Sequence, residues 1–109
     1  MIQVNILRDR NEVVKGIDIN GHAGYAEYGQ DVICAAVSAL ALNMANSVES
    51  FTDDHFEGSV SEDGGEFSFS FPDSISPESQ LLMKSLILGL ESVRDEYGAE
   101  YIKFRFREV

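Results

Sequence analysis

The chain has 109 residues, a length that fits one domain over residues 1–109 and can bury a core without disulfides or metals. Its net charge of −11 argues against nucleic acid as a direct partner, because phosphate binding needs a basic surface. The charge is compatible with a basic protein partner, and equally with a role in solubility alone. A lone cysteine cannot form an internal disulfide, so we expect a cytoplasmic protein in a reducing compartment.

Neither a leader nor a membrane span is expected. Residues 1–7 form an alternating apolar run that lacks the features of a signal peptide. The most apolar segment, residues 33–45, is too short to cross a bilayer and contains polar side chains. We therefore expect no membrane partner.

Two strands and a loop begin the chain. Residues 2–8 alternate between apolar and polar side chains, which is the period of a half-buried strand. Residues 12–20 form a second candidate, and the polar turn between the two predicts an antiparallel hairpin. Residues 21–30 show neither period, and a connection of this length is often functional. Its glycines predict a mobile loop: Gly21, Gly24 and Gly29.

A helix is expected from Val32 to Glu49, with Asp31 as its N-cap. Apolar residues on two of its sides predict that it is covered twice, by the sheet and by either a second helix or a partner subunit. The face expected toward the core consists of Ile33, Val37, Leu40 and Met44.

A hairpin follows, with strands at His55–Ser61 and Glu66–Phe71 and a turn at residues 62–65. Ser76 and Pro77 then predict the start of a second helix, and Gly98 its end. The core face of that helix is expected to contain Leu82, Leu86, Leu90, Val93 and Tyr97.

A last strand is predicted at residues 99–107, with Ile102, Phe104 and Phe106 directed inward. The element order is therefore β-β-α-β-β-α-β. Hairpins combined with two helices indicate an α+β fold, in which two helices pack on a mostly antiparallel five-stranded sheet.

Cys34 and His22 are the candidate catalytic residues. Cys34 falls in the first turn of the predicted helix, where the helix dipole and unpaired N–H groups stabilise a thiolate. A fold-back of the loop would place His22 beside the thiol as its base. Both effects, with partial exposure, predict a lowered pKa for Cys34. The helix-start amides, including that of Cys34, would hold an oxyanion.

Asp31 and Ser38 are supporting candidates on the same side of the helix as Cys34. Asp31 is expected to cap the helix, and alternatively to orient His22. Ser38 can donate a hydrogen bond to the thiolate or substrate, or equally bond its own backbone.

The structural alternative is that Cys34 is simply a small buried core residue. The other histidine, His55, is interpreted as a surface residue. Two histidines and one cysteine on separate elements do not form a metal site, so no metal is expected.

Two segments together resemble the signature of the ribosomal-processing cysteine protease family, Prp. They are Gly21-His22-Ala23 and Asp31-Val32-Ile33-Cys34-Ala35-Ala36-Val37-Ser38. The resemblance extends to chain length and element order. It implies that His22 matches the general base and Cys34 the nucleophile, while Asp31 and Ser38 match further motif residues.

The resemblance also implies a substrate and an assembly. The expected reaction removes the N-terminal extension of a large-subunit ribosomal protein, at a short apolar site that contains phenylalanine. The family forms homodimers and uses no cofactor. Two alternatives stay open: a non-catalytic module that binds a ribosomal protein, and a different thiol hydrolase using the same dyad.

Overall fold

Seven elements appear in the predicted order within residues 1–27 and 31–109, which the computed structural model describes. They are β1 (Ile2–Arg8), β2 (Val14–Asn20), α1 (Val32–Phe51), β3 (Glu57–Val60), β4 (Glu66–Ser70), α2 (Pro77–Tyr97) and β5 (Ile102–Glu108). The third strand is shorter than the predicted span His55–Ser61, and the first helix extends two residues beyond Glu49.

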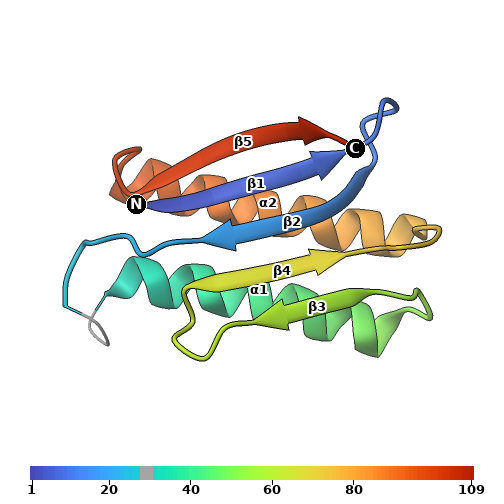
Figure 1. The fold of residues 1–109 in the computed structure, drawn as a ribbon, viewed down its shortest axis with the longest axis horizontal. Coiled ribbons are helices and arrows are strands. Elements are labelled where there is room, and N and C mark those ends of the chain that lie inside the picture. The colour runs from blue at the N-terminus through green and yellow to red at the C-terminus, as the bar shows by residue number, and fades with distance from the viewer. Residues whose placement is uncertain (28–30) are drawn as a thin grey trace.

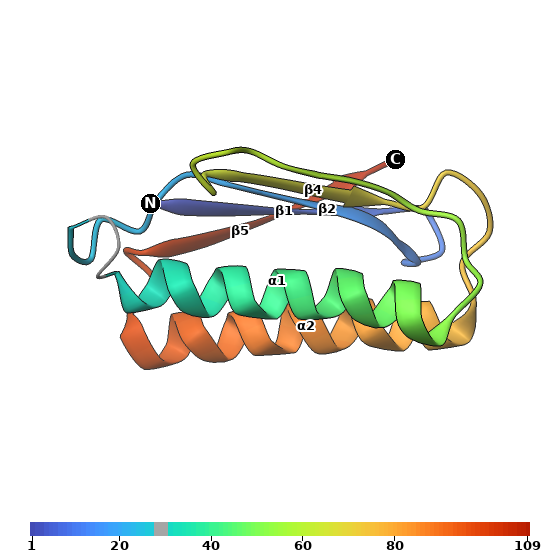
Figure 2. The ribbon, with the colours of Figure 1, turned by 90° about the horizontal axis from the view of Figure 1, so that it is seen from below.

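The strands form one sheet in the order β3-β4-β2-β1-β5. All neighbouring pairs are antiparallel except β1 and β5, which run parallel. A parallel pair needs a long crossover, and α2 supplies it by carrying the chain from β4 to the far edge. Both helices lie side by side on one face of the sheet (Figures 1 and 2). The predicted α+β fold is confirmed, although the parallel pair was not predicted.

The core lies between the sheet and the two helices. Alternation along β1 places Ile2, Val4 and Ile6 against the helices, because successive side chains of a strand point to opposite faces. The helices themselves pack closely: a Cβ built on Gly89 of α2 would lie only 3.1 Å from Leu40 Cδ1 of α1. The second helix is therefore one of the two covers predicted for the first.

The two predicted core faces of α2 and β5 are each wrong at one residue, and the others are buried or packed against the core. On α2, Met83 and Ser79 are fully buried, whereas Tyr97 is 38% exposed. The final turn of α2 thus turns its tyrosine away from the core. On β5, Phe106 is 54% exposed and the Arg8 guanidinium lies 4.0 Å above its ring. The twist of the sheet carries the end of β5 away from the helices, so Phe106 cannot reach the core (Figure 2).

The helix α1 is longer than the apolar segment 33–45 that was expected to be too short to span a bilayer. Its 20 residues and mean hydropathy of 1.4 would be enough, by length and composition alone, to cross a membrane. A core helix has the same properties. One stripe of α1 is buried, and it consists of Ile33, Val37, Ala41, Met44 and Val48.

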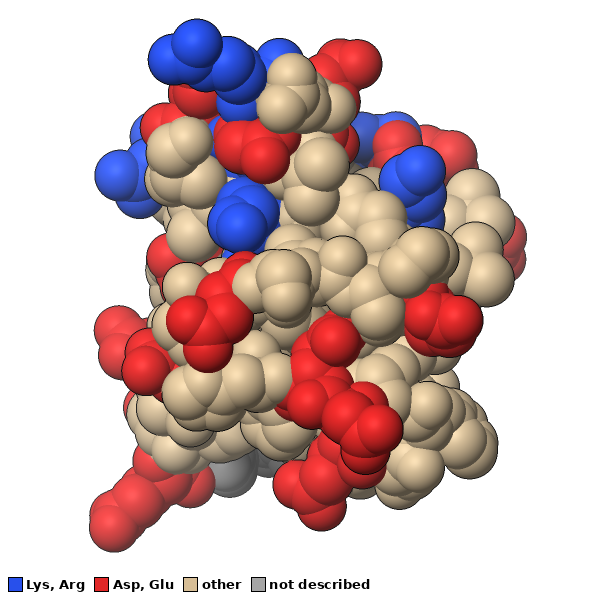
Figure 3. Space-filling view, turned by 90° about the vertical axis from the view of Figure 1, so that its right-hand side faces the viewer, with Lys and Arg blue, Asp and Glu red and all other residues tan. Residues whose placement is uncertain are grey.

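Charge is unevenly distributed over the end of the molecule where α1 ends and α2 begins. Figure 3 shows Lys and Arg confined to the upper part of this view, while Asp and Glu are spread over the whole face and are the charged residues of its lower part. The outward residues of β5 contribute basic side chains, namely Lys103, Arg105 and Arg107. The large acidic excess is therefore carried by the rest of the chain.

Candidate active site

Asp31 starts α1 and ties the preceding loop to it. Its Oδ1 accepts hydrogen bonds from the backbone N–H groups of Ile33 at 3.0 Å and Cys34 at 3.1 Å. Its Oδ2 accepts from the N–H of Tyr25 at 3.0 Å. The predicted N-cap role is observed, and the carboxylate is only 8% exposed. These backbone hydrogen bonds join the helix start to the loop and supply the cap.

His22 follows the end of β2 on an anchored stretch of backbone. The amino group of Met1 donates to the His22 carbonyl oxygen, and the Gly21 N–H donates to the Gly65 carbonyl at 2.9 Å. Gly21 adopts a φ of +94°, and a Cβ there would lie 2.4 Å from the Met1 carbonyl oxygen. Any other residue at this position would therefore be strained and would clash with Met1. His22, which was predicted to lie on a mobile loop, is therefore among the first residues of that loop, and these are held by hydrogen bonds. Gly29, the third glycine predicted for the loop, lies outside the described residues.

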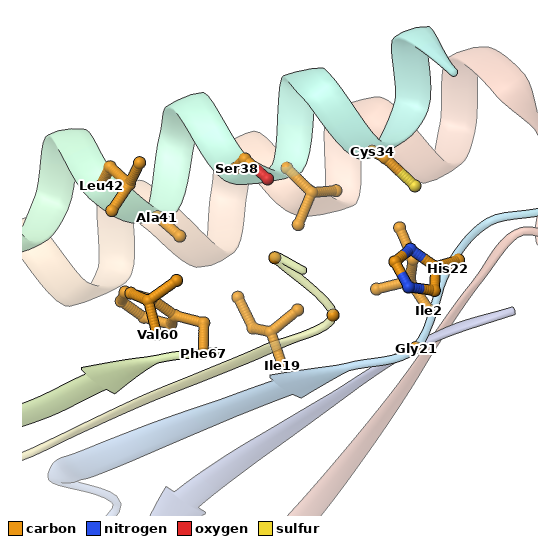
Figure 4. A pocket seen from close by; sticks show the side chains of 13 residues that line it. Ile2, Ile19, Gly21, His22, Cys34, Ser38, Ala41, Leu42, Val60 and Phe67 are labelled. Atoms are coloured by element: carbon orange, nitrogen blue, oxygen red, sulfur yellow. The ribbon is translucent and has the colours of Figure 1, made fainter. Parts of the chain in front are cut away.

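The fold brings His22 and Cys34 together, as predicted. The Ala23 N–H donates to Cys34 Sγ at 3.4 Å, which places the sulfur beside the residue that follows His22. In Figure 4 the Cys34 thiol points toward the His22 imidazole. His22 is exposed and Cys34 is half-buried, so both can be reached from solvent.

Two adjoining cavities meet at this pair. The first, of about 160 Å³, lies between α1 and the sheet and is walled by apolar side chains that include Val37, Leu42 and Phe67. The second, of about 410 Å³, is more open and is lined by polar residues that include Asp31 and Asp63. His22, Cys34 and Ser38 line both cavities. Ser38 therefore faces the same space as the thiol, one helical turn further on.

The lowered pKa predicted for Cys34 is wrong for this structure. Partial burial raises the pKa of the thiol above its usual value; the Ala23 N–H acts in the opposite direction, and the charge and hydrogen bonding of Asp31 raise it again. The helix start does supply N–H groups, but those of Ile33 and Cys34 already donate to the Asp31 carboxylate. The resting thiol is therefore protonated near neutrality, and attack requires a base that removes the proton.

The role predicted for the Cys34 amide is also wrong in this structure. Its N–H donates to Asp31 Oδ1, and the Ala35 N–H donates to the Asp31 carbonyl at 3.1 Å. A donor that is already engaged cannot hold an oxyanion without breaking the cap. The described N–H that is directed at the sulfur itself comes from Ala23, in the loop.

The pKa of Asp31 is lowered, although burial of its carboxyl alone would raise it. Hydrogen bonds from the backbone N–H groups of Cys34, Tyr25 and Ile33 and from the Cys34 side chain outweigh that burial. Asp31 is therefore ionised at neutral pH, and its negative charge opposes formation of the neighbouring thiolate.

Asp31→Asn is expected to make Cys34 more reactive toward iodoacetamide, although it adds no base. Asparagine caps helices about as well as aspartate, so α1 keeps its start, while the charge that raises the thiol pKa is removed. We expect the alkylation rate at pH 7 to rise severalfold and its pH midpoint to fall. If the alkylation rate rises only at high pH and its pH midpoint is unchanged, the substitution has increased access to the thiol, and the electrostatic explanation is wrong.

A tyrosine cluster fixes the loop from its other side, and sequence reasoning missed it. The Tyr25 ring meets the rings of Tyr97 and Tyr101 edge-to-face, with centroids 5.7 and 5.3 Å apart. Such pairs are worth about 0.5–1.5 kcal/mol beyond area burial. The partners lie at the end of α2 and before β5, so no local sequence pattern links them to the loop.

Asp63 is a second residue at the site that sequence reasoning missed. It belongs to the turn between β3 and β4, which reads from sequence only as a hairpin turn. The turn reaches the open cavity and brings Asp63 and Gly64 to the same wall as His22. The only sequence feature that could have indicated Asp63 is the acidic composition of the turn, and acidic turns are usually just exposed to solvent.

Within residues 1–27 and 31–109, no three His, Cys, Asp or Glu side chains are grouped closely enough to hold a metal ion. His55 is exposed, and its Nδ1 lies 3.0 Å from Asp73 Oδ2. This histidine therefore makes a surface contact with Asp73 and does not line either of the two cavities.

Comparison with known proteins identifies a family that the chain matches over most of its length. A family model described as cysteine protease Prp matches residues 1–103. The ribosomal processing cysteine protease Prp of Bacillus subtilis (strain 168) is 37% identical over 101 residues, covering 89% of this chain and 90% of that protein. A crystal structure of the essential ribosomal processing protease Prp from S. aureus, with a covalently linked product peptide, is 28% identical. It superposes with a TM-score of 0.92 over 98% of this chain and 100% of that one. The S. aureus enzyme with a substrate peptide gives 27% identity and a TM-score of 0.86, with the same shares covered.

Proposed function

The chain belongs to the cysteine protease Prp family, and on that premise we propose that it is an endopeptidase acting through Cys34 and His22. Its substrate is an N-terminally extended ribosomal protein of the large subunit. The observation that carries the proposal is the meeting of thiol and imidazole at the junction of two cavities. Relatives named as ribosomal processing proteases support the substrate class.

Cys34 is the nucleophile of the proposed reaction. His22 removes the thiol proton, and the sulfur attacks the scissile carbonyl carbon. The tetrahedral intermediate collapses as the protonated His22 returns its proton to the leaving amine, which leaves a thioester on Cys34. Water, activated by His22, then hydrolyses the thioester and releases the N-terminal fragment. A base is needed at the first step because the resting thiol is protonated.

The apolar cavity fits a phenylalanine of the cleavage site. An apolar cavity of about 150 Å³ in another protein holds a benzene molecule. The cavity beside Cys34 has about 160 Å³ and is walled by aliphatic and aromatic side chains. A phenyl ring placed there would hold the peptide backbone in the open cavity, next to the thiol. The acidic charge of the chain favours a substrate whose mature part is basic.

The supporting residues have separate proposed roles. Asp31 holds the helix start that carries Cys34 and joins it to Tyr25 of the loop. Ser38 presents its hydroxyl to the space in which substrate binds, and there it donates to substrate or thiolate. Residues of the loop after His22 close over the bound peptide and exclude water.

The resemblance further supports a cytoplasmic homodimer that needs no cofactor. One surface suited to self-association lies on the outer side of α2, where Leu81 and Leu88 stand two turns apart. They are 68% and 65% exposed. Apolar side chains that are open in the single chain become buried when a partner covers them.

The test is to incubate the purified chain with the extended ribosomal protein and sequence the new N-terminus of the product. We expect a single cut directly after the short apolar segment, and we expect no cut when its phenylalanines are replaced by glutamate. Binding without cleavage would support the non-catalytic alternative instead. Cleavage of simple thioesters but not of the extended protein would identify a different thiol hydrolase.

A further inference from the structure

We propose that Asp63 is a positioning residue, which holds the His22 imidazole in place opposite Cys34 and stabilises its protonated form. The inference rests on the proposed function, because it assigns a purpose to the proton that His22 accepts. Asp63 lies 41 residues beyond His22 in the chain, and only the hairpin β3–β4 brings the two together.

The geometry centres on Gly65. A Cβ built on this buried residue would lie 3.0 Å from His22 Nε2 and 3.2 Å from Asp63 Oδ1. The imidazole and the carboxylate thus flank the same point and are at most about 6 Å apart, a range in which opposite charges favour ionisation. Both also line the open cavity and a further hollow beside it. Because Gly65 has no side chain, the His22 ring can lie close to its backbone.

The Asp63 carboxylate is itself held by the turn. Its Oδ1 accepts from the Ser61 hydroxyl at 2.7 Å and from the Gly65 N–H at 2.9 Å. These bonds come from the hairpin and fix the carboxyl group before any substrate binds. The pKa of Asp63 is lowered, first by the Gly65 N–H and the Ser61 hydroxyl, and also by the charge of His22. Asp63 is therefore an anion whenever His22 takes up a proton.

Other charged groups also surround His22. From α1, Cys34 and the capping Asp31 face the shared cavity, and Asp31 is engaged by the helix and loop amides. From β4, Glu66 lines the neighbouring hollow. The amino group of Met1 contacts the His22 carbonyl and carries a positive charge.

The two carboxylates at the site therefore act on different partners. Asp31 disfavours the thiolate, whereas Asp63 favours the imidazolium. The Asp63 carboxylate therefore favours transfer of the proton from Cys34 to His22. This effect offsets the opposing effect of Asp31 on the thiolate. Because Asp63 is exposed, its effect should weaken as salt is added.

The test uses Asp63→Asn, which removes the charge but leaves an oxygen in place to accept from Ser61 and Gly65. Glu62→Gln is the matched control, because it removes one negative charge from the neighbouring position of the same turn. The two histidines of the chain make the readout simple: NMR titration of the ring signals in a Cys34→Ser background follows His22, with His55 as internal reference.

In Asp63→Asn we expect the His22 titration midpoint to fall by about half a pH unit, with no change for His55 and none in Glu62→Gln. The acid limb of the kcat profile should move to lower pH by the same amount, with KM unchanged and kcat down roughly threefold on the plateau, because His22 becomes a weaker base. An unchanged midpoint, or an equal shift in Glu62→Gln, overturns the inference. The titration needs no activity, so its failure is distinct from failure of the proposed protease function.

Discussion

Cys34→Ala is expected to abolish cleavage of the extended ribosomal protein, with a loss of kcat on the order of 10⁴-fold or more. The reason is that Cys34 is the only thiol of the chain and lies where the apolar and open cavities meet. His22→Ala should cost nearly as much, because the thiol is protonated at rest and loses its base. Cleavage under single-turnover conditions, followed by gel or mass spectrometry, measures both losses.

The chain provides a matched control for the histidine. His55→Ala removes the other imidazole, which pairs with Asp73 on the surface, and it should leave cleavage unchanged. Thermal unfolding of all three variants should stay close to that of the parent, because none of the replaced side chains is fully buried. Full activity in the Cys34→Ala protein would remove the nucleophile from the mechanism.

Gly21→Ala is expected to produce the largest loss of stability among single-methyl changes. The new Cβ would lie 2.4 Å from the Met1 carbonyl oxygen, and the backbone would keep a φ of +94° that L-residues avoid. Strain and clash together should lower the free energy of unfolding by roughly 3 kcal/mol and the melting temperature by roughly 12–20 °C. Calorimetry or circular dichroism measures the loss.

Gly24→Ala separates the two causes. Gly24 also has a positive φ, of +73°, but a Cβ there would meet nothing within 4 Å. Only the backbone strain remains, so we expect a loss of about 1 kcal/mol. Equal destabilisation by the two substitutions would show that the contact with Met1 contributes nothing. Gly21→Ala should also reduce cleavage in the protein that remains folded, because it displaces the neighbouring His22.

Local patterns carried most of the fold prediction. The alternation of residues 2–8, the cap at Asp31 and the start at Ser76-Pro77 are signals within a few residues of the chain, and each marks the observed element. The faces of Tyr97 and Phe106 were wrong because they depend on tertiary context. Tyr97 meets a loop ring some seventy residues away in the chain, and Phe106 is carried off the core by the sheet twist. The parallel pairing of β1 with β5 has no local signal either.

The site could be predicted only in part, for the same reason. A cysteine at a helix start and a histidine beside glycines predicted the pair, and the fold brings them together. The pKa of Cys34 was predicted in the wrong direction, since the sequence does not show that Asp31 occupies the helix-start amides and places its charge next to the sulfur. Asp63 and the tyrosine cluster come from other elements, so only the folded structure reveals them.

The claim that Cys34 performs the chemistry is tested most directly by the intact mass of the protein during turnover. Excess extended substrate is mixed with the chain and the reaction is quenched in acid at successive times before steady state. We predict a transient species heavier by the N-terminal fragment less one water, mapped to Cys34 by digestion and absent from the Cys34→Ala protein. Turnover in which Cys34 stays unmodified throughout, or an adduct on another residue, would contradict the account.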